Sequence, residues 1–415
     1  MKRFFNFFEN GATQHLEDSF LVIESTNATQ LELSQLPRGI VCTLLLRLSL
    51  ARNGTQAVVL SALLFMAITW VPLLVLCLGQ GTALIGSVQM PLLSDYISAA
   101  RFLVVAPLLI LSDLMTKPWL LKVASHIVSE HIAANDAARY NNVTLRIFHL
   151  RDAVSIQLIL LLIAVASSAL WVHLILSVHI TNWQVASSSN QAILSSAGQW
   201  HTFISQPLFR FVLLDWFLDY ALWTFFLFKV SRFSLRISAT HPDGVGGLSF
   251  IAVGQSPFCV AAFALSTAMC SVVAQTILET QAPLQSFANL GILFVAVILV
   301  LFLGPLLVFT PLLVNTKRQA IFSYGALCHQ LNAGFASKWI AGEQPEEPLS
   351  ELGLEPSTLA DLNTSFENVR NMRAFVFGKQ SLVVFVAAAC LPAFPLVASV
   401  IPLKELLRQL LKALA

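Results

Sequence analysis

Seven long stretches with few charged residues constrain the fold of this chain more than any other feature. A helix needs about 20 mostly apolar residues, rising about 1.5 Å each, to cross a bilayer. Five stretches meet this length well, at about 57–78, 153–178, 207–230, 257–278 and 287–314. We therefore expect an all-α polytopic membrane protein.

The other two stretches are less regular. The stretch at about 97–115 has an uncharged core between Arg101 and Asp113, whose side chains can extend towards the membrane surface. The stretch at about 381–402 contains Pro392, Pro395 and Pro402. Proline removes a backbone donor and clashes with the preceding helical turn. The sequence thus predicts about seven transmembrane helices, or six plus a re-entrant segment broken by prolines.

The composition supports this class. Hydrophobic residues make up 56% of the 415 residues, charged residues 11%, and the mean hydropathy is +0.75. Soluble domains carry about 25% charged residues because their surfaces face water. The formal net charge of +2 gives no reason to expect a nucleic-acid partner. The partners that we consider are membrane lipid and a second copy of the chain.

Lysine and arginine alternate between the connecting segments. They number five in 1–56, none in 79–96, five in 116–152, none in 179–206, three in 229–256, none in 279–286 and six in 315–380. Because basic loops stay in the cytoplasm, the N-terminus is predicted to be cytoplasmic. The four Asn-x-Ser/Thr sequons all fall on that side, which fits a multi-pass protein of a bacterial inner membrane.

The segments outside the spans are predicted to include helical extensions. The domain organisation comprises a cytoplasmic segment 1–56, the bundle 57–314, a cytoplasmic helical loop 315–380, the seventh stretch, and a tail at 403–415. Apolar residues recur at helical spacing in 119–133 and 359–376. The tail alternates leucine clusters with basic residues, as an interfacial amphipathic helix does.

Charged and titratable residues inside the spans are the first candidates for function. Such a charge costs several kcal/mol in a membrane unless it is paired or hydrated. The candidates are Arg101, Asp113, His173, Arg210, Asp215 and Asp219. The predicted topology places Asp113 near the inner end of its span, Asp219 near the middle, and the other four in the outer half.

Two interpretations of these charges remain open. In the first, Arg101 and Arg210 pair with Asp215 and Asp219 and hold the bundle together. In the second, the same side chains line a water-filled pathway or substrate site. The two aspartates lie four residues apart and share a helix face, so their repulsion would raise one pKa and suit proton or cation coupling.

A glycine-rich loop follows the fourth long stretch. It reads Thr-His-Pro-Asp-Gly-Val-Gly-Gly-Leu and contains His241, Asp243, Gly244, Gly246 and Gly247. Its glycines supply the positive φ angles that a tight turn needs. One interpretation is a rigid turn. A second is a backbone nest that binds a small anionic ligand, helped by Arg232 and Arg236 upstream, and a third is a metal site of His241 and Asp243. We assign no metal and no cofactor.

The same loop carries a resemblance. The segment 232–250 resembles one in uncharacterised bacterial multi-pass membrane proteins that share the pattern Thr-His-Pro-Asp-x-x-Gly-Gly-Leu, matched here at 240–248. The resemblance implies a membrane protein of similar layout and brings no activity with it.

Three functions are compatible with these features. The leading hypothesis is a transporter- or channel-like protein for a small solute or ion, because charges lie in several spans. The alternatives are a membrane enzyme that acts on lipid or prenyl-phosphate substrates at the cytoplasmic surface, and a non-catalytic scaffold or sensor. The sequence contains no complete catalytic motif.

Overall fold

The computed structural model describes residues 53–84, 88, 90–131, 134–177, 182–188, 191–342 and 356–400. Almost all of these residues are helical, and the two strands among them, β1 (Val185–Ser188) and β2 (Gln191–Leu194), form one antiparallel hairpin. The segment 1–52, the tail 403–415 and most of the acidic linker before Pro356 lie outside the described residues.

Six helical runs are long and apolar enough to cross a membrane within the described part of the chain, and there are seven if a bent pair of helices forms one span. The first is α3 (Gly54–Gly79). The second joins α4 (Tyr96–Ala99), η2 (Ala100–Val105), α5 (Ala106–His126) and η3 (Ile127–His131). The bent pair is α6 (Ala134–Asp152) and α7 (Val154–Ser177), which meet at 45°.

The remaining four runs complete the bundle. One joins α8 (Ser196–Trp200), η4 (His201–Ser205) and α9 (Gln206–Val230). The next joins α10 (Ser249–Gln255), η5 (Ser256–Phe258) and α11 (Cys259–Thr280). The longest joins η6 (Leu284–Phe287), α12 (Ala288–Leu303), η7 (Gly304–Phe309), α13 (Thr310–Ala336) and η8 (Ser337–Ala341). The last joins α16 (Lys379–Cys390), η9 (Leu391–Ala393) and α17 (Phe394–Val400). Outside these runs lie the short turn η1 (Leu92–Ser94) and α15 (Pro356–Asn371).

The chain is therefore an all-α, multi-pass membrane protein, as its sequence predicts, but several helices are longer than their apolar stretches. The run Tyr96–Glu130 has 35 residues and the run Ser196–Val230 also has 35. A bilayer core needs only about 20. The predicted helix at 119–133 is thus mostly a direct continuation of the second span. Pro118 lies inside α5 and does not end this helix.

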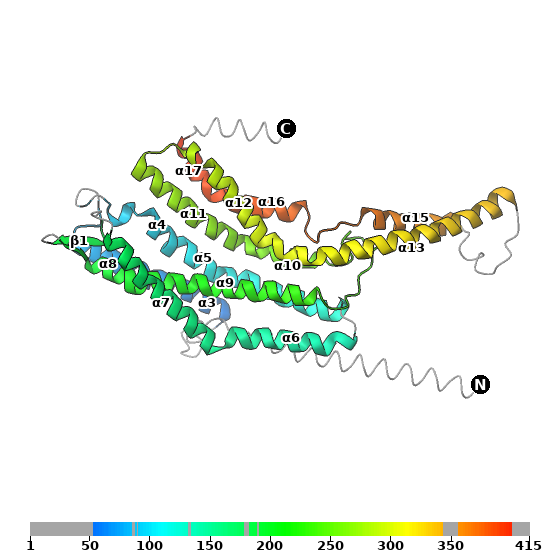
Figure 1. The fold of residues 1–415 in the computed structure, drawn as a ribbon, viewed down its shortest axis with the longest axis horizontal. Coiled ribbons are helices and arrows are strands. Elements are labelled where there is room, and N and C mark those ends of the chain that lie inside the picture. The colour runs from blue at the N-terminus through cyan, green and yellow to red at the C-terminus, as the bar shows by residue number, and fades with distance from the viewer. Residues whose placement is uncertain are drawn as a thin grey trace.

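The molecule is elongated, and its two ends differ (Figure 1). One end, here called the α8 end, holds α4, α8 and the β-hairpin. The other end is here called the α13 end. There α13 packs beside α15 and the two helices form a projecting arm. In the last run, the predicted proline break is present as the 3₁₀ turn η9 between α16 and α17. That run keeps enough length to count as a span.

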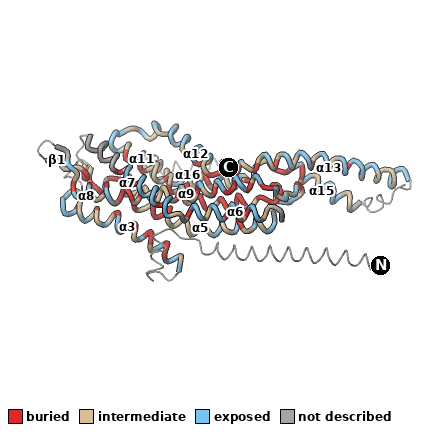
Figure 2. The backbone as a smooth tube through the Cα atoms, turned by 60° about the horizontal axis from the view of Figure 1, so that its bottom comes forward, coloured by how far each residue is buried: buried red, intermediate tan, exposed pale blue. Residues whose placement is uncertain are grey.

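The core follows the axis of the bundle, where buried residues concentrate while the outer faces stay exposed (Figure 2). Its centre is aromatic: Trp216 stacks on Tyr220, and Phe302 stacks on Phe385. Many large apolar side chains on the outer faces are exposed, among them Leu162 at 71% and Val300 at 72%. Because this apolar surface would be unstable in water, the exposed faces are those expected to contact lipid.

Candidate functional site

Five charged side chains from three helices meet beside α9. Arg151, at the end of α6, is only 10% exposed and reaches both aspartates of α9. Its Nη2 donates to Asp215 Oδ2 at 2.9 Å and to Asp219 Oδ2 at 3.2 Å, and its Nε also contacts Asp219. Arg151 therefore holds the end of α6 against the middle of α9.

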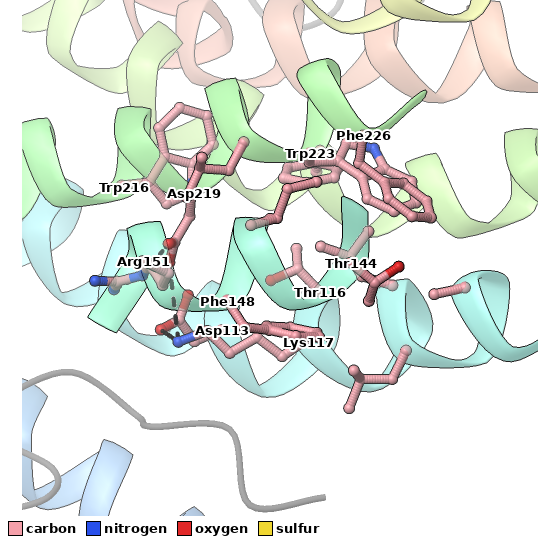
Figure 3. A pocket seen from close by; sticks show the side chains of 16 residues that line it. Asp113, Thr116, Lys117, Thr144, Phe148, Arg151, Trp216, Asp219, Trp223 and Phe226 are labelled. Carbon is pink, nitrogen blue, oxygen red and sulfur yellow. Dashed lines mark hydrogen bonds and ion pairs between the residues drawn. The ribbon is translucent and has the colours of Figure 1, made fainter. Parts of the chain in front are cut away.

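Lys117 of α5 completes the cluster. Its Nζ lies 2.6 Å from Asp113 Oδ2, one turn earlier on the same helix, and 3.9 Å from Asp219 Oδ2. Figure 3 shows the Arg151 and Lys117 side chains converging on Asp219 from opposite helices. Three carboxylates and two cations give the cluster a formal charge of −1 (−3 + 2).

The predicted partners of the aspartates were wrong. Among the described residues, neither Arg101 nor Arg210 forms an ion pair with Asp215 or Asp219. Arg101 lies over the ring of Phe209, with 5.8 Å between its Cζ and the ring centroid. Arg210 donates to the hydroxyl oxygens of Ser167 at 3.1 Å and Ser168 at 2.9 Å on α7. The true partner, Arg151, belongs to a segment that the sequence assigned to a cytoplasmic loop.

The neighbours of the cluster show which helix ends lie level with it. Asp215 Oδ1 accepts a hydrogen bond of 3.0 Å from Gln157 Nε2 in the first turn of α7. On α5, Leu114 belongs to the apolar group that packs on Ala57 and Val58, near the start of α3. The cluster therefore lies level with the starts of α3 and α7. The depth of Asp219 in the membrane stays a prediction.

A cavity of about 120 Å³ lies against this cluster, between α5, α6 and α9. Four of the five charged residues line it, and Asp215 stands behind Arg151. The rest of the wall is formed by Thr116, Leu120, Leu121, Ala124, Thr144, Ile147, Phe148, Trp216, Leu222, Trp223, Phe226 and Phe258. The cavity therefore has one charged end and an aromatic and aliphatic body (Figure 3).

A second group of polar residues lies at the α8 end, and it shares no residue with the lining of the cavity. Asp95 accepts hydrogen bonds from Ser98 and, at 3.1 Å, from the indole of Trp183. His201 is 1% exposed and packs edge-on against Trp183 and Phe102. Between this group and the charge cluster the buried rings of Phe102 and Phe209 are in contact. The His173 side chain lies outside the described residues.

The glycine-rich loop between α9 and α10 is a turn built around Asp243. The φ angles are +67° at Gly244, +70° at Gly246 and +91° at Gly247, as the sequence predicts for a tight turn. One oxygen of Asp243 accepts from the N–H groups of Val245 at 2.8 Å and Gly247 at 3.1 Å, and the other from Ser249 at 3.1 Å. The loop's own carboxylate thus occupies the backbone donors that an anion-binding nest would need.

These bonds set the ionisation of Asp243. Burial alone would raise the pKa of this carboxyl, but the backbone N–H groups of Val245, Gly247 and Ser249 and the His241 side chain outweigh it, so the pKa is lowered. Arg373, which follows α15, closes the loop from outside: its N–H donates to Gly244 O at 2.7 Å and its guanidinium to Asp243 O at 3.1 Å. The loop is therefore fastened to the α13 end of the molecule.

His241 and Arg232, the other candidates in and before this loop, each contact different neighbours. His241 is 46% exposed at its side chain, with Nδ1 2.9 Å from Asp243 Oδ1. Arg232 lies over the ring of Phe228 on α9, at 5.0 Å. Among the described residues, no group of three or more His, Cys, Asp or Glu side chains is arranged to hold a metal ion.

These features define a multi-pass α-helical membrane protein with a charged cavity beside its spans. No family model, curated protein or solved structure matches the chain. The resemblance of residues 240–248 to bacterial membrane proteins therefore stays an expectation, and the function has to be argued from the site.

Proposed function

We propose that this chain is a transporter-like protein of a bacterial inner membrane and that its substrate is a small organic cation. The cavity at the charge cluster is the binding site in this proposal. The substrate would enter from the cytoplasm, with Asp113 and Asp219 as its counter-charges and the aromatic wall of α9 as its apolar contact.

The observation that carries the proposal is the position of the charge cluster, with its formal charge of −1, at one end of an aromatic cavity. Two of its three carboxylates, Asp113 and Asp219, line the cavity, and the third, Asp215, adds negative charge behind Arg151. The rings of Trp216, Trp223 and Phe226 line the same cavity. Carboxylates combined with aromatic faces are the groups that attract quaternary ammonium ions. A volume of about 120 Å³ is roughly that of four water molecules in the liquid, which suits a small cation.

The orientation in this proposal rests on the distribution of basic residues. The loop after α9, which is fastened to the α13 end, contains Arg232 and Arg236, and α13 itself contains Lys317 and Arg318. The connecting segments at the α8 end, 80–95 and 281–287, contain no lysine or arginine. The positive-inside rule favours a cytoplasmic α13 end, and in this proposal the substrate reaches the cavity from that side.

The contact between Phe102 and Phe209 supports a site that is closed towards the outer side of the membrane. Phe102 and Phe209 lie between the cavity and the polar residues of the α8 end. The π-helical turns η2 and η4 carry Phe102 and His201, which meet edge-on at 5.7 Å. Such turns are rare inside α-helices and are frequent at functional sites. We place the outer gate of the transporter at this pair.

The test uses tetramethylammonium, a small quaternary cation that does not cross lipid by itself. Radiolabelled tetramethylammonium should bind the purified full-length protein and enter vesicles that contain it. Asp219→Asn removes a counter-charge, and Leu222→Trp fills the cavity without touching a charge. Both variants should reduce binding by about tenfold or more, the effect of about 1.4 kcal/mol.

Asp136→Asn is the matched control, because Asp136 is a carboxylate of α6 that does not line the cavity. It should leave binding unchanged. Unchanged binding in Leu222→Trp, or equal loss in Asp136→Asn, would refute the site. Binding without uptake into vesicles would refute transport and leave a cation-binding sensor.

A further inference from the structure

A second pocket, separate from the cavity, lies between α6 and the end of α9. Its volume is about 440 Å³. Four of its lining residues are cations: Arg139 and Arg146 from α6, Lys229 from α9, and Arg232 just after α9. The pocket shares no lining residue with the cavity at the charge cluster.

No carboxylate lines this pocket or forms an ion pair with its four cations within the part of the chain that the structure describes. Asp136, one turn before Arg139 on α6, accepts a hydrogen bond from the Ser234 N–H at 3.3 Å instead. Four like charges held together without counter-charges repel one another. Their proximity therefore favours an anion between them.

Aromatic rings hold two of these arginines in place. The guanidinium of Arg139 lies 5.4 Å from the centroid of Phe233, and that of Arg232 lies 5.0 Å from the centroid of Phe228. Both rings line the pocket. A cation over a ring face is attracted by the ring and loses part of its freedom to move, while its N–H groups can still donate. Arginine side chains held in this way can make paired hydrogen bonds to phosphate oxygens.

We propose that this pocket binds a negatively charged, phosphate-bearing ligand. Arg139 and Arg232 would hold it by planar, two-pronged contacts, and Arg146 and Lys229 would add charge. The ligand is a soluble phosphate compound or the headgroup of an anionic phospholipid, since both present the same chemistry to the four cations.

Two measurements distinguish the sources. The full-length protein in detergent is titrated with inorganic pyrophosphate, and the protein in lipid nanodiscs is tested for selective retention of phosphatidylglycerol over phosphatidylcholine. The double variant R139Q/R146Q removes two cations from the exposed face of α6. The matched control is Arg370→Gln, which removes a cation of α15 outside the pocket.

A soluble ligand predicts saturable binding of pyrophosphate to the wild type, weakened by roughly tenfold or more in R139Q/R146Q and unchanged in Arg370→Gln. A lipid ligand predicts no binding of pyrophosphate, and selective retention of phosphatidylglycerol that only the double variant loses. The proposal is overturned if R139Q/R146Q changes neither measurement, or if Arg370→Gln weakens binding equally. Thermal melting of each variant in the same detergent shows that it is folded.

Discussion

At the scale of single residues, Arg151 is the side chain on which the charge cluster depends most. It contacts both Asp215 and Asp219 while remaining 10% exposed. Arg151→Gln would leave two carboxylates partly buried without their main partner. We expect it to lower the free energy of unfolding by about 3–5 kcal/mol, measured by thermal or denaturant unfolding in detergent.

The control for this prediction is Arg210→Gln. Arg210 donates to two serine hydroxyls and neutralises no carboxylate, so its loss should cost only about 1–2 kcal/mol. Adding Asp215→Asn to Arg151→Gln should recover part of the loss, because one stranded charge is removed. Equal destabilisation by the two arginine variants would show that the network does not depend on Arg151.

Asp243 gives the glycine-rich loop a dependence on pH. Its pKa is lowered in the folded chain, so the unfolded chain takes up this proton more readily, with a pKa of about 3.9. The stability that Asp243 contributes is therefore complete above that value and is lost as the pH falls through the lower folded pKa. In Asp243→Asn, melting temperature should fall less than in the wild type between about pH 5 and pH 3. Parallel pH profiles for the two proteins would contradict this.

The glycines of this loop make a second testable point. Gly247 has φ +91°, which is strained for any other residue. Gly247→Val should destabilise by about 1–3 kcal/mol. Gly291→Ala is the control, since a Cβ there meets nothing within 4 Å. A melting temperature for Gly247→Val equal to that of the wild type would show that position 247 does not require a residue that tolerates positive φ.

At the scale of elements, the sequence predicts the spans well and their extensions poorly. Runs of about 20 apolar residues identify spans because lipid demands them. Beyond its apolar stretch, α5 remains helical and is held by contacts with other helices, for example the hydrogen bond of 2.8 Å that the Tyr140 hydroxyl of α6 donates to Ala124 O of α5. Such contacts join residues far apart in the chain, so periodicity within one segment cannot reveal them.

The same limit explains the missed partner in the site. The sequence shows that Asp215 and Asp219 need counter-charges, but 64 positions separate Arg151 from Asp215. Arg151 precedes a span and was counted among loop residues, whereas the bend between α6 and α7 brings it against α9. The glycine-rich turn was predictable, because Asp243 and the glycines act on neighbours within six residues.

The contact of α10 with α5 tests packing between elements. A Cβ at Gly254 of α10 would collide with the side chain of Val123 on α5. Gly254→Ala should therefore destabilise by about 1–3 kcal/mol. The double variant Gly254→Ala with Val123→Ala should recover part of this loss, because the second change makes room for the first. Destabilisations that simply add would show that the two sites are not in contact.

At the scale of the whole molecule, the two ends of the bundle differ in length and in their polar residues. The α13 end extends well beyond the level at which α3 and α7 begin, and it carries the basic pocket and the fastened glycine-rich loop. The α8 end has short connections, the β-hairpin and buried polar residues such as His201. If the α13 end is cytoplasmic, both the cavity and the basic pocket meet cytoplasmic solutes.

The orientation can be measured directly. In a variant of the full chain without its native cysteines, a cysteine is placed either at Gln80, in the exposed turn after α3, or at Ser323, on the exposed side of α13. Because the segment 79–96 has no basic residue, the cysteine at 80 should react with a membrane-impermeant maleimide in cells whose outer membrane is permeable. The cysteine at 323 should react only after the inner membrane is opened. Reaction at 323 in sealed cells would invert the orientation, and it would place the cation cavity and the basic pocket on the outer side.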